Sequence, residues 1–300
     1  MENFKIIINK NINDDLEDFQ YLFGLYKKWN FTQNEKVEVD FKGCKFLRPN
    51  AVVVLGALIR KLQKQGNIVS INLETIDSDV RHNLVINGIL STLGFAQPKN
   101  NQGNSIPYRE DTSNNEDDFY SYLFSLWLGR GWIKISEELK IHIIQPVLEA
   151  YINVFDHAQS PIGSVACGQR YPNRDELVLS IADIGIGIPN SVRKHLNSPL
   201  LSSKKCLEWS FEPTKSTKNL VDSGLVGRGN GLKILRDFMR ENNGKLEIYS
   251  DTGYVCINAQ DTVFQDGLTP FNGTFVQISV KCDEKFYSLP QEEDSSEFLF

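Results

Sequence analysis

The chain has 300 residues, of which 41% are hydrophobic and 23% charged, and its formal net charge is −6. This composition is typical of a globular protein with one large or two medium domains, and the acidic balance argues against a general nucleic-acid binder. Five scattered cysteines with no C-x-x-C pair argue against a structural zinc site. The segment MENFKIIINKN lacks the features of a secretion signal, and no stretch approaches the ~18 apolar residues of a membrane span, so we expect a cytoplasmic protein without a membrane partner.

The first third of the sequence alternates between strand and helix patterns. The spacing of its apolar residues predicts strands at 4–8, 36–41 and 67–73 and helices at 14–30, 50–66 and 77–88. Alternating strands and helices build a parallel or mixed sheet with helices packed on it. We therefore expect an α/β domain over residues 1–96.

The composition changes after this domain. Residues 97–118 are polar and rich in Asn and Asp, which predicts a linker or mobile loop. Residues 119–132, FYSYLFSLWLGRGW, are apolar and aromatic, and we expect them to form a helix that docks on the next domain.

The second half mixes helices and strands. We expect a long helix over 136–158, which Pro146 either kinks or divides, and a strand pair over 163–171 and 176–183 joined by a turn. A polar, irregular stretch follows over 190–226, then a helix at 230–242 and strands at 245–250, 253–259 and 273–281. The tail 283–300 is acidic and without periodicity, which predicts disorder or an acidic arm.

Four motifs of the second half contain residue types that suit nucleotide chemistry. In EAYINVFDH, Glu149 and Asn153 are four residues apart and therefore lie on one helix face. The motif DIGIGIP places Asp183 and two glycines at the end of a strand, where glycine indicates a close approach of the backbone to another group. VGRGNGLKIL leads three glycines into a helix, and NGTFVQISV is the fourth motif.

Each of these residue types has a matching chemical role. Exposed N–H groups at a glycine-rich helix start, together with the helix dipole, favour phosphate. An amide oxygen such as that of Asn153 can bind Mg²⁺, and a carboxylate such as that of Glu149 can orient and deprotonate a water. Asp183 can accept a hydrogen bond from the exocyclic amine of adenine. Taken in this order, the four motifs predict an ATP site.

The same motifs resemble those of the GHKL ATPase family, which includes sensor histidine kinases, anti-sigma serine kinases and type II topoisomerases. EAYINVFDHA is similar to the N-box, DIGIGIP and GRGNGL to the two glycine boxes, and GTF to the last short box. WSFEPTKSTK also resembles the run that precedes the second glycine box in many sensor kinases. The resemblance covers residues 135–281 and implies a Bergerat-type α/β sandwich within a GHKL-type domain over 119–282.

The resemblance also implies roles for individual residues. Glu149 would be the catalytic base, and Asn153 the Mg²⁺ ligand. The residues expected to contact the nucleotide are Asn153, Asp183, Gly185, Gly187, Lys218, Gly227, Arg228, Gly229, Asn230, Gly231, Leu232 and Thr274. Within this set Asp183 would read adenine, Gly185 and Gly187 would clear space for the base, and Arg228 and Asn230 would either contact phosphate or face solvent. ATP and Mg²⁺ are the implied cofactors.

Residues 36–96 resemble, less closely, the STAS fold of anti-sigma antagonists. The resemblance departs at the helix start, where Arg48–Ala51 stands in place of the usual phosphorylatable serine. The expected fold class is therefore a two-domain α/β protein, with a STAS-like domain followed by the ATPase domain.

Three functions remain open at this level. The first is a regulatory protein that binds and hydrolyses ATP and couples the nucleotide state to a protein partner, with the STAS-like domain packed in cis or across a homodimer. The second is a serine kinase of the anti-sigma type that acts on a separate chain. The third is a nucleotide-gated binding module without turnover. Histidine autophosphorylation is not expected, because none of the four histidines lies on a dimerising helical hairpin.

Overall fold

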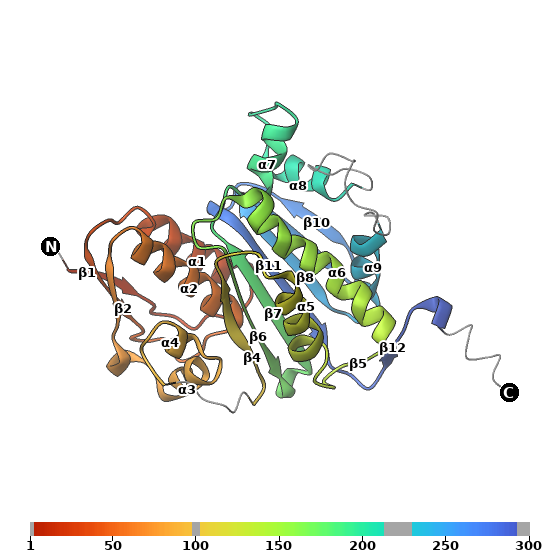
Figure 1. The fold of residues 1–300 in the computed structure, drawn as a ribbon, viewed down its shortest axis with the longest axis horizontal. Coiled ribbons are helices and arrows are strands. Elements are labelled where there is room, and N and C mark those ends of the chain that lie inside the picture. Colours follow the sequence, from red (N-terminus) through yellow and green to blue (C-terminus); the bar gives the residue numbers. More distant parts are fainter. Residues whose placement is uncertain (1–2, 98–102, 213–229, 293–300) are drawn as a thin grey trace.

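The computed structural model describes residues 3–97, 103–212 and 230–292. Its elements stack in four layers: a three-stranded sheet, a pair of helices, a seven-stranded sheet and a second group of helices (Figure 1). The mixed α/β class with a large antiparallel sheet agrees with the coarse prediction from the sequence.

The N-terminal module forms the first two layers. Its three strands are parallel and lie in the order β1-β2-β3. Its elements are β1 (Asn3–Ile7), α1 (Leu16–Trp29), β2 (Lys36–Asp40), α2 (Pro49–Lys64), β3 (Ile68–Ile71), the turn η1 (Leu73–Thr75), α3 (Ser78–Ile86) and α4 (Ile89–Thr92).

Helix α2 is the centre of this module. Every residue from Pro49 to Ile59 is buried, because the helix lies between the two sheets. A helix that is apolar on all sides needs such a position, and the run Val52–Leu55 provides apolar side chains in every direction. The predicted strand and helix alternation of the first third is thus confirmed.

The second part of the chain forms the other two layers. Its seven-stranded sheet has the order β10-β9-β8-β11-β7-β6-β4, and all of its pairs are antiparallel. The strands of this sheet are β4 (Ser105–Asp111), β6 (Ser164–Tyr171), β7 (Glu176–Asp183), β8 (Lys245–Asp251), β9 (Gly253–Asn258), β10 (Thr262–Gln265) and β11 (Phe271–Lys281). The short strands β5 (Lys134–Ile135) and β12 (Phe286–Tyr287) pair with each other. The helices and turns are α5 (Glu116–Ser121), η2 (Tyr122–Trp127), α6 (Glu137–Asn153), η3 (Val154–Ala158), η4 (Pro172–Arg174), α7 (Gly187–His195), α8 (Ser203–Ser210) and α9 (Asn230–Glu241).

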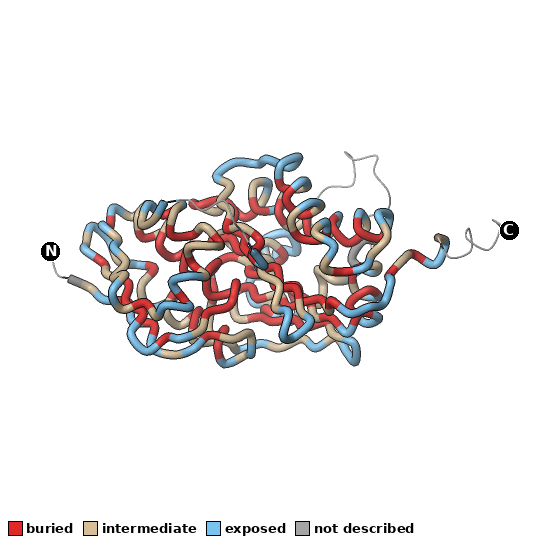
Figure 2. Tube along the Cα trace, turned by 90° about the horizontal axis from the view of Figure 1, so that it is seen from below, coloured by how far each residue is buried: buried red, intermediate tan, exposed pale blue. Residues whose placement is uncertain are grey.

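The two faces of the large sheet pack against different helices. On one face Tyr249, Phe271 and Phe275 join the core of the N-terminal module, where α1 supplies Phe19 and Phe23. On the other face Leu179, Ile181 and Ile278 pack with the helices α5, α6 and α9. This alternation follows from the period of two along each strand. Buried residues therefore run through both parts of the molecule (Figure 2).

A buried ion cluster fastens the N-terminal module to the sheet. The side chain of Arg48, 1% exposed, contacts Glu176 on β7 at 2.5 Å and Asp14 at 3.2 Å. Its guanidinium also lies over the Tyr171 ring. Arg48 therefore links the N-terminal module to the large sheet within the same chain.

The structure corrects the predictions for three segments in which polar residues suggested irregular chain. Residues 105–111 of the predicted linker form β4, because this segment pairs with β6 and buries Ile106 and Tyr108. The stretch 190–226 begins with the helices α7 and α8, and its residues 213–226 lie outside the described part. Within the tail, Tyr287 and Leu289 are buried and β12 pairs with β5, although residues 293–300 lie outside the described part.

Three further features can be compared with the predictions: the proline in α6, the aromatic segment and the edge of the large sheet. Pro146 lies inside α6 and does not divide it, and the predicted helix 136–158 ends in the π-helical turn η3. The aromatic segment after the expected linker forms α5 and the π-helical turn η2, which dock on the sheet as predicted. The edge strand β10 was not predicted.

Candidate functional site

A row of polar side chains crosses the large sheet at one end. The strand registers place Asp111 beside Ser164, Ser164 beside Asp183, and Thr274 beside Ser250. Asp183 and Thr274 are joined by a hydrogen bond from the backbone N–H of Thr274 to the carboxylate Oδ2, at 3.1 Å. We call these five residues the polar row.

The next row along the strands differs in character. It lies two residues further from the sheet end, on the same face. On five strands its side chains are apolar and pack under the helices: Ala166, Ile181, Val276, Ile248 and Val255. On β4 its member is Arg109, which pairs with Asp111 of the polar row. On β6, β7, β8 and β11 the change from apolar to polar side chains therefore occurs across one repeat of the strand. Such a row at the end of a core-facing surface indicates a site rather than packing.

Asp183 is the most perturbed group of the polar row. It is 3% exposed, and its carboxylate accepts hydrogen bonds from the backbone N–H groups of Gly185 at 2.7 Å and Thr274 at 3.1 Å. Burial raises its pKa from 3.8 to about 7, although these two hydrogen bonds lower it. A buried acceptor with a pKa in this range is typical of functional sites.

The glycines that follow Asp183 meet neighbouring protein atoms. A Cβ at Gly185 would collide with the carbonyl oxygen of Ala158. At Gly187 the φ angle is +76°, and a Cβ would lie 2.6 Å from the Oγ of Ser250. Gly273 has a φ of +116°, and a Cβ there would collide with the carbonyl oxygen of Asp183. These contacts explain the glycines within the protein itself, and a role in clearing space for a base stays a prediction.

Ser250 is a site residue that the sequence analysis missed. It is fully buried, and its Oγ accepts a hydrogen bond from the Ile188 N–H at 2.9 Å and donates one to the Gly273 carbonyl at 2.7 Å. The same oxygen lies 3.3 Å from the Thr274 Oγ1. A serine at the end of a strand carries no local signal for this position, because its partners come from distant parts of the chain.

Helix α6 presents Glu149 and Asn153 on its exposed side. The opposite side of the helix buries Ile143, Ile144 and Tyr151 among others. The turn η3, which continues α6, is tied to the turn after Asp183: the Ile186 N–H donates to the Ala158 carbonyl at 2.8 Å. The helix with the predicted base and the strand with the predicted adenine acceptor are thus connected at one end.

The donor chemistry at Asn153 fits a Mg²⁺ ion only with help from other oxygens. Within residues 3–97, 103–212 and 230–292 no group of three His, Cys, Asp or Glu side chains could hold a metal. Mg²⁺ usually keeps waters and takes one or two protein ligands together with substrate phosphates. The exposed amide oxygen of Asn153 suits that kind of site.

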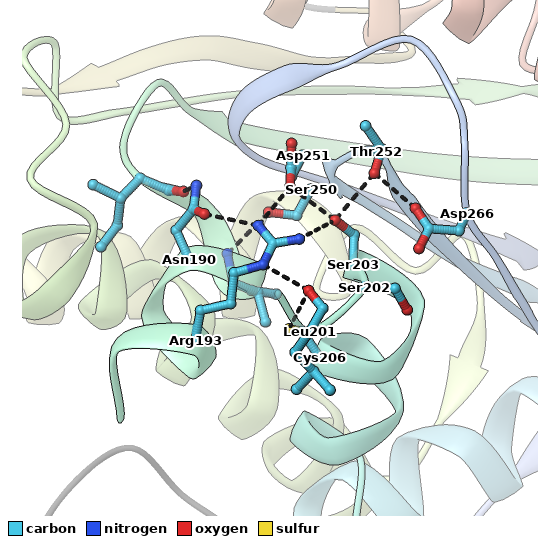
Figure 3. Close-up of polar contacts among 12 residues, drawn as sticks. Asn190, Arg193, Leu201, Ser202, Ser203, Cys206, Ser250, Asp251, Thr252 and Asp266 are labelled. Atoms are coloured by element: carbon cyan, nitrogen blue, oxygen red, sulfur yellow. Dashed lines mark hydrogen bonds and ion pairs between the residues drawn. The ribbon is translucent and has the colours of Figure 1, made fainter. Parts of the chain in front are cut away.

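Helices α7 and α8 are fixed to the sheet by a cluster around Arg193 (Figure 3). The guanidinium donates to Asp251 Oδ2 at 2.8 Å, to Ser203 Oγ at 2.9 Å and to the Leu201 carbonyl at 2.8 Å. Ser203 also donates to Asp251 at 2.8 Å. The first part of the stretch that was predicted to be irregular is therefore anchored beside the polar row.

Several predicted nucleotide contacts cannot be placed. Lys218, Gly227, Arg228 and Gly229 lie outside the described residues. Asn230, Gly231 and Leu232 form the first turn of α9, and their side chains are outside the described part. Of the predicted residues that are described, Asp183, Gly185, Gly187 and Thr274 gather at one end of the sheet, and Glu149 and Asn153 lie on α6.

Comparison with known proteins finds a likeness among solved structures. No family model and no curated protein matches the chain. Among solved structures it is similar to the ATP-binding domain of topoisomerase IV from Francisella tularensis, solved with a small-molecule inhibitor, at 13% identity and a TM-score of 0.26. The match covers 55% of this chain and 42% of that one, so the chain spans less than half of its neighbour's length. In the described part of the chain we find no helix with the length and apolar character of a membrane span.

Proposed function

We propose that residues 119–282 bind ATP with Mg²⁺ and hydrolyse it slowly, as part of a regulatory protein. The observation that carries this proposal is the geometry of Asp183, a buried acceptor held by the N–H groups of Gly185 and Thr274. A carboxylate in that setting recognises an amine such as the N6 group of adenine. The order of the four motifs along the chain is the second support.

The remaining predicted residues have complementary roles in this proposal. Glu149 would orient the attacking water and take its proton, because an exposed carboxylate can reach both the water and solvent. Asn153 would hold the Mg²⁺ ion, which supplies charge neutralisation at the phosphates when bound. The glycine segment Gly227–Gly231 would bind phosphate at the start of α9.

Calorimetry with ATP and GTP, with and without Mg²⁺, tests the binding step. We expect ATP to bind with Mg²⁺ and GTP to bind at least tenfold more weakly, because the guanine O6 would face the Asp183 carboxylate. Equal binding of the two nucleotides, or no binding of ATP, would contradict the proposal.

Phosphate release separates the enzyme from a binding module without turnover. The unmutated protein should release inorganic phosphate slowly, and Glu149→Gln should retain ATP binding while losing this release. Absence of hydrolysis in both proteins would favour the gated binding module.

The N-terminal module has a proposed role in coupling. Because α1 and α2 pack on the sheet that contains the polar row, we infer that this module transmits the nucleotide state to a protein partner or to a second copy of the chain. Its likeness to the STAS fold stays a prediction. With labelled ATP we expect residues 1–96 to stay unlabelled, since the segment Arg48–Ala51 has no serine. Labelling of a separate protein would favour the serine kinase.

A further inference from the structure

Ser250 connects two glycine turns that are far apart in the sequence. One turn follows Asp183 and contains Gly187, and the other is the bulge at Gly273, which precedes Thr274 on β11. The register of β11 against β8 is irregular between Phe271 and Thr274, so the backbone there is not held by a regular ladder. A side chain that bonds to both turns therefore decides their relative position.

The contacts of Ser250 use both functions of its hydroxyl. The oxygen accepts from the Ile188 N–H and donates its single proton to the Gly273 carbonyl. With these two bonds the hydroxyl has a fixed orientation, which leaves a lone pair toward the Thr274 hydroxyl 3.3 Å away. Thr274 can then donate toward Ser250 or toward the Asp183 carboxylate, whose pKa its side chain lowers.

The effect of Ser250 reaches Asp183 through short links. The Thr274 N–H is one of the two donors to the Asp183 carboxylate, and the Gly185 N–H, in the turn that Ser250 holds at Ile188, is the other. Loss of the Ser250 hydroxyl would remove one hydrogen bond from each turn at once. It would also leave the half-buried Ile188 N–H and the buried Gly273 carbonyl without this partner.

We propose that Ser250 is a positioning residue of the base pocket, which sets the discrimination between adenine and guanine by holding Thr274 and the turn after Asp183 together. The inference rests on the proposed function, since it concerns the same pocket. Ser250 is not expected to touch the phosphates or the Mg²⁺ ion.

The experiment compares Ser250→Ala with Ser180→Ala. Ser180 is a matched control, because it is also fully buried in the large sheet. Its replacement by alanine removes one side-chain hydrogen bond, to Gln277, and both residues lie on the sheet face opposite to that of Ser250. ATP and GTP affinities are measured for both variants and for the unmutated protein by calorimetry, together with the thermal midpoint of unfolding.

We expect Ser250→Ala to weaken ATP binding about tenfold and to lower the ATP-to-GTP affinity ratio by about tenfold, with little change in GTP affinity. Ser180→Ala should keep both affinities even if its midpoint falls. An unchanged ATP-to-GTP ratio in Ser250→Ala would overturn the inference and leave Ser250 a structural residue.

Two further outcomes are distinguishable. If the unmutated protein binds no ATP, the proposed function fails and the inference fails with it. If Ser250→Ala does not fold, Ser250→Cys preserves the volume and keeps a weak donor. A lower ATP-to-GTP ratio in that variant supports the inference, and an unchanged ratio overturns it.

Discussion

The two faces of the seven-stranded sheet are covered to different degrees. The face toward the N-terminal module is filled by aromatic side chains, with Phe23 in ring contact with Tyr249, Phe271 and Phe275. The face toward α5, α6 and α9 has an apolar centre but ends in the polar row. One face is therefore filled by packed rings, whereas the other ends in hydrogen-bonded polar side chains. This comparison predicts that substitutions on the first face change stability and those in the row change binding.

The largest effect on the free energy of unfolding is expected from a substitution on the aromatic face, the sheet face that packs against the N-terminal module. Phe23→Ala should lower the free energy of unfolding by about 4 kcal/mol, because it removes a fully buried ring and leaves a cavity. Denaturant unfolding measures this change. Phe31→Ala is the control, since that ring is 74% exposed and its loss should stay within about 0.5 kcal/mol. Equal effects of the two substitutions would remove the distinction between the aromatic face and the surface.

Disruption of the ion cluster around Arg48, on the same face, is expected to have the second-largest effect on the free energy of unfolding. Arg48→Met should lower the free energy of unfolding by about 3 kcal/mol, because Glu176 and Asp14 would lose their buried partner. Lys204→Met, which removes an exposed pair with Glu208, should leave the unfolding midpoint unchanged. A stability gain in Arg48→Met would mean that the cost of burying these charges exceeds their attraction.

In the polar row the expected effect is on binding and depends on pH. Since the pKa of Asp183 is raised to about 7, we expect ATP to bind about tenfold more weakly at pH 6 than at pH 8, where the carboxylate is ionised. Asp183→Asn should weaken binding at both pH values and flatten the profile, which also controls for titration of the phosphates. A steep profile that persists in Asp183→Asn would assign the dependence to another group.

The same carboxyl predicts a trend in the unliganded protein. Because its pKa is higher in the folded state than the 3.8 of the unfolded chain, its contribution to stability is fully present below about pH 4 and is lost as the pH rises through about 7. Between about pH 4 and about pH 7 the thermal midpoint of unfolding of the unmutated protein should fall more steeply with rising pH than that of Asp183→Asn. A parallel pair of curves would contradict the raised pKa.

The smallest effect on stability is expected from a substitution where α7 and α8 join the sheet. Arg193→Lys should cost about 1 kcal/mol, since one ammonium cannot replace the fork that binds Asp251, Ser203 and the Leu201 carbonyl. Hydrogen exchange of residues 203–210 should become about fivefold faster, with no change in α6. Unchanged exchange would show that α8 is held by its apolar contacts alone.

Local patterns were sufficient for much of this fold. The alternation of strands and helices in residues 1–96, the β6–β7 pair and α9 follow from the spacing of apolar residues, which depends only on neighbours in the sequence. The motif at Asp183 was recognisable for the same reason, because a carboxylate followed by two glycines at a strand end is a local feature. Strand β4 was missed, since Ser105, Arg109, Glu110 and Asp111 make up most of its seven residues and its pairing with β6 depends on a distant part of the chain.

The sequence by itself determined the order of the elements and the residue types available for nucleotide chemistry. Only the tertiary structure decided which of them meet. Ser164, Ser250 and Thr274 share one row with Asp183 because the registers of four distant strands place them there, and a shift of one residue in any pair would turn a side chain to the other face. The burial of Arg48 against Glu176 likewise depends on how the N-terminal helices pack on the sheet, and no local pattern contains that information.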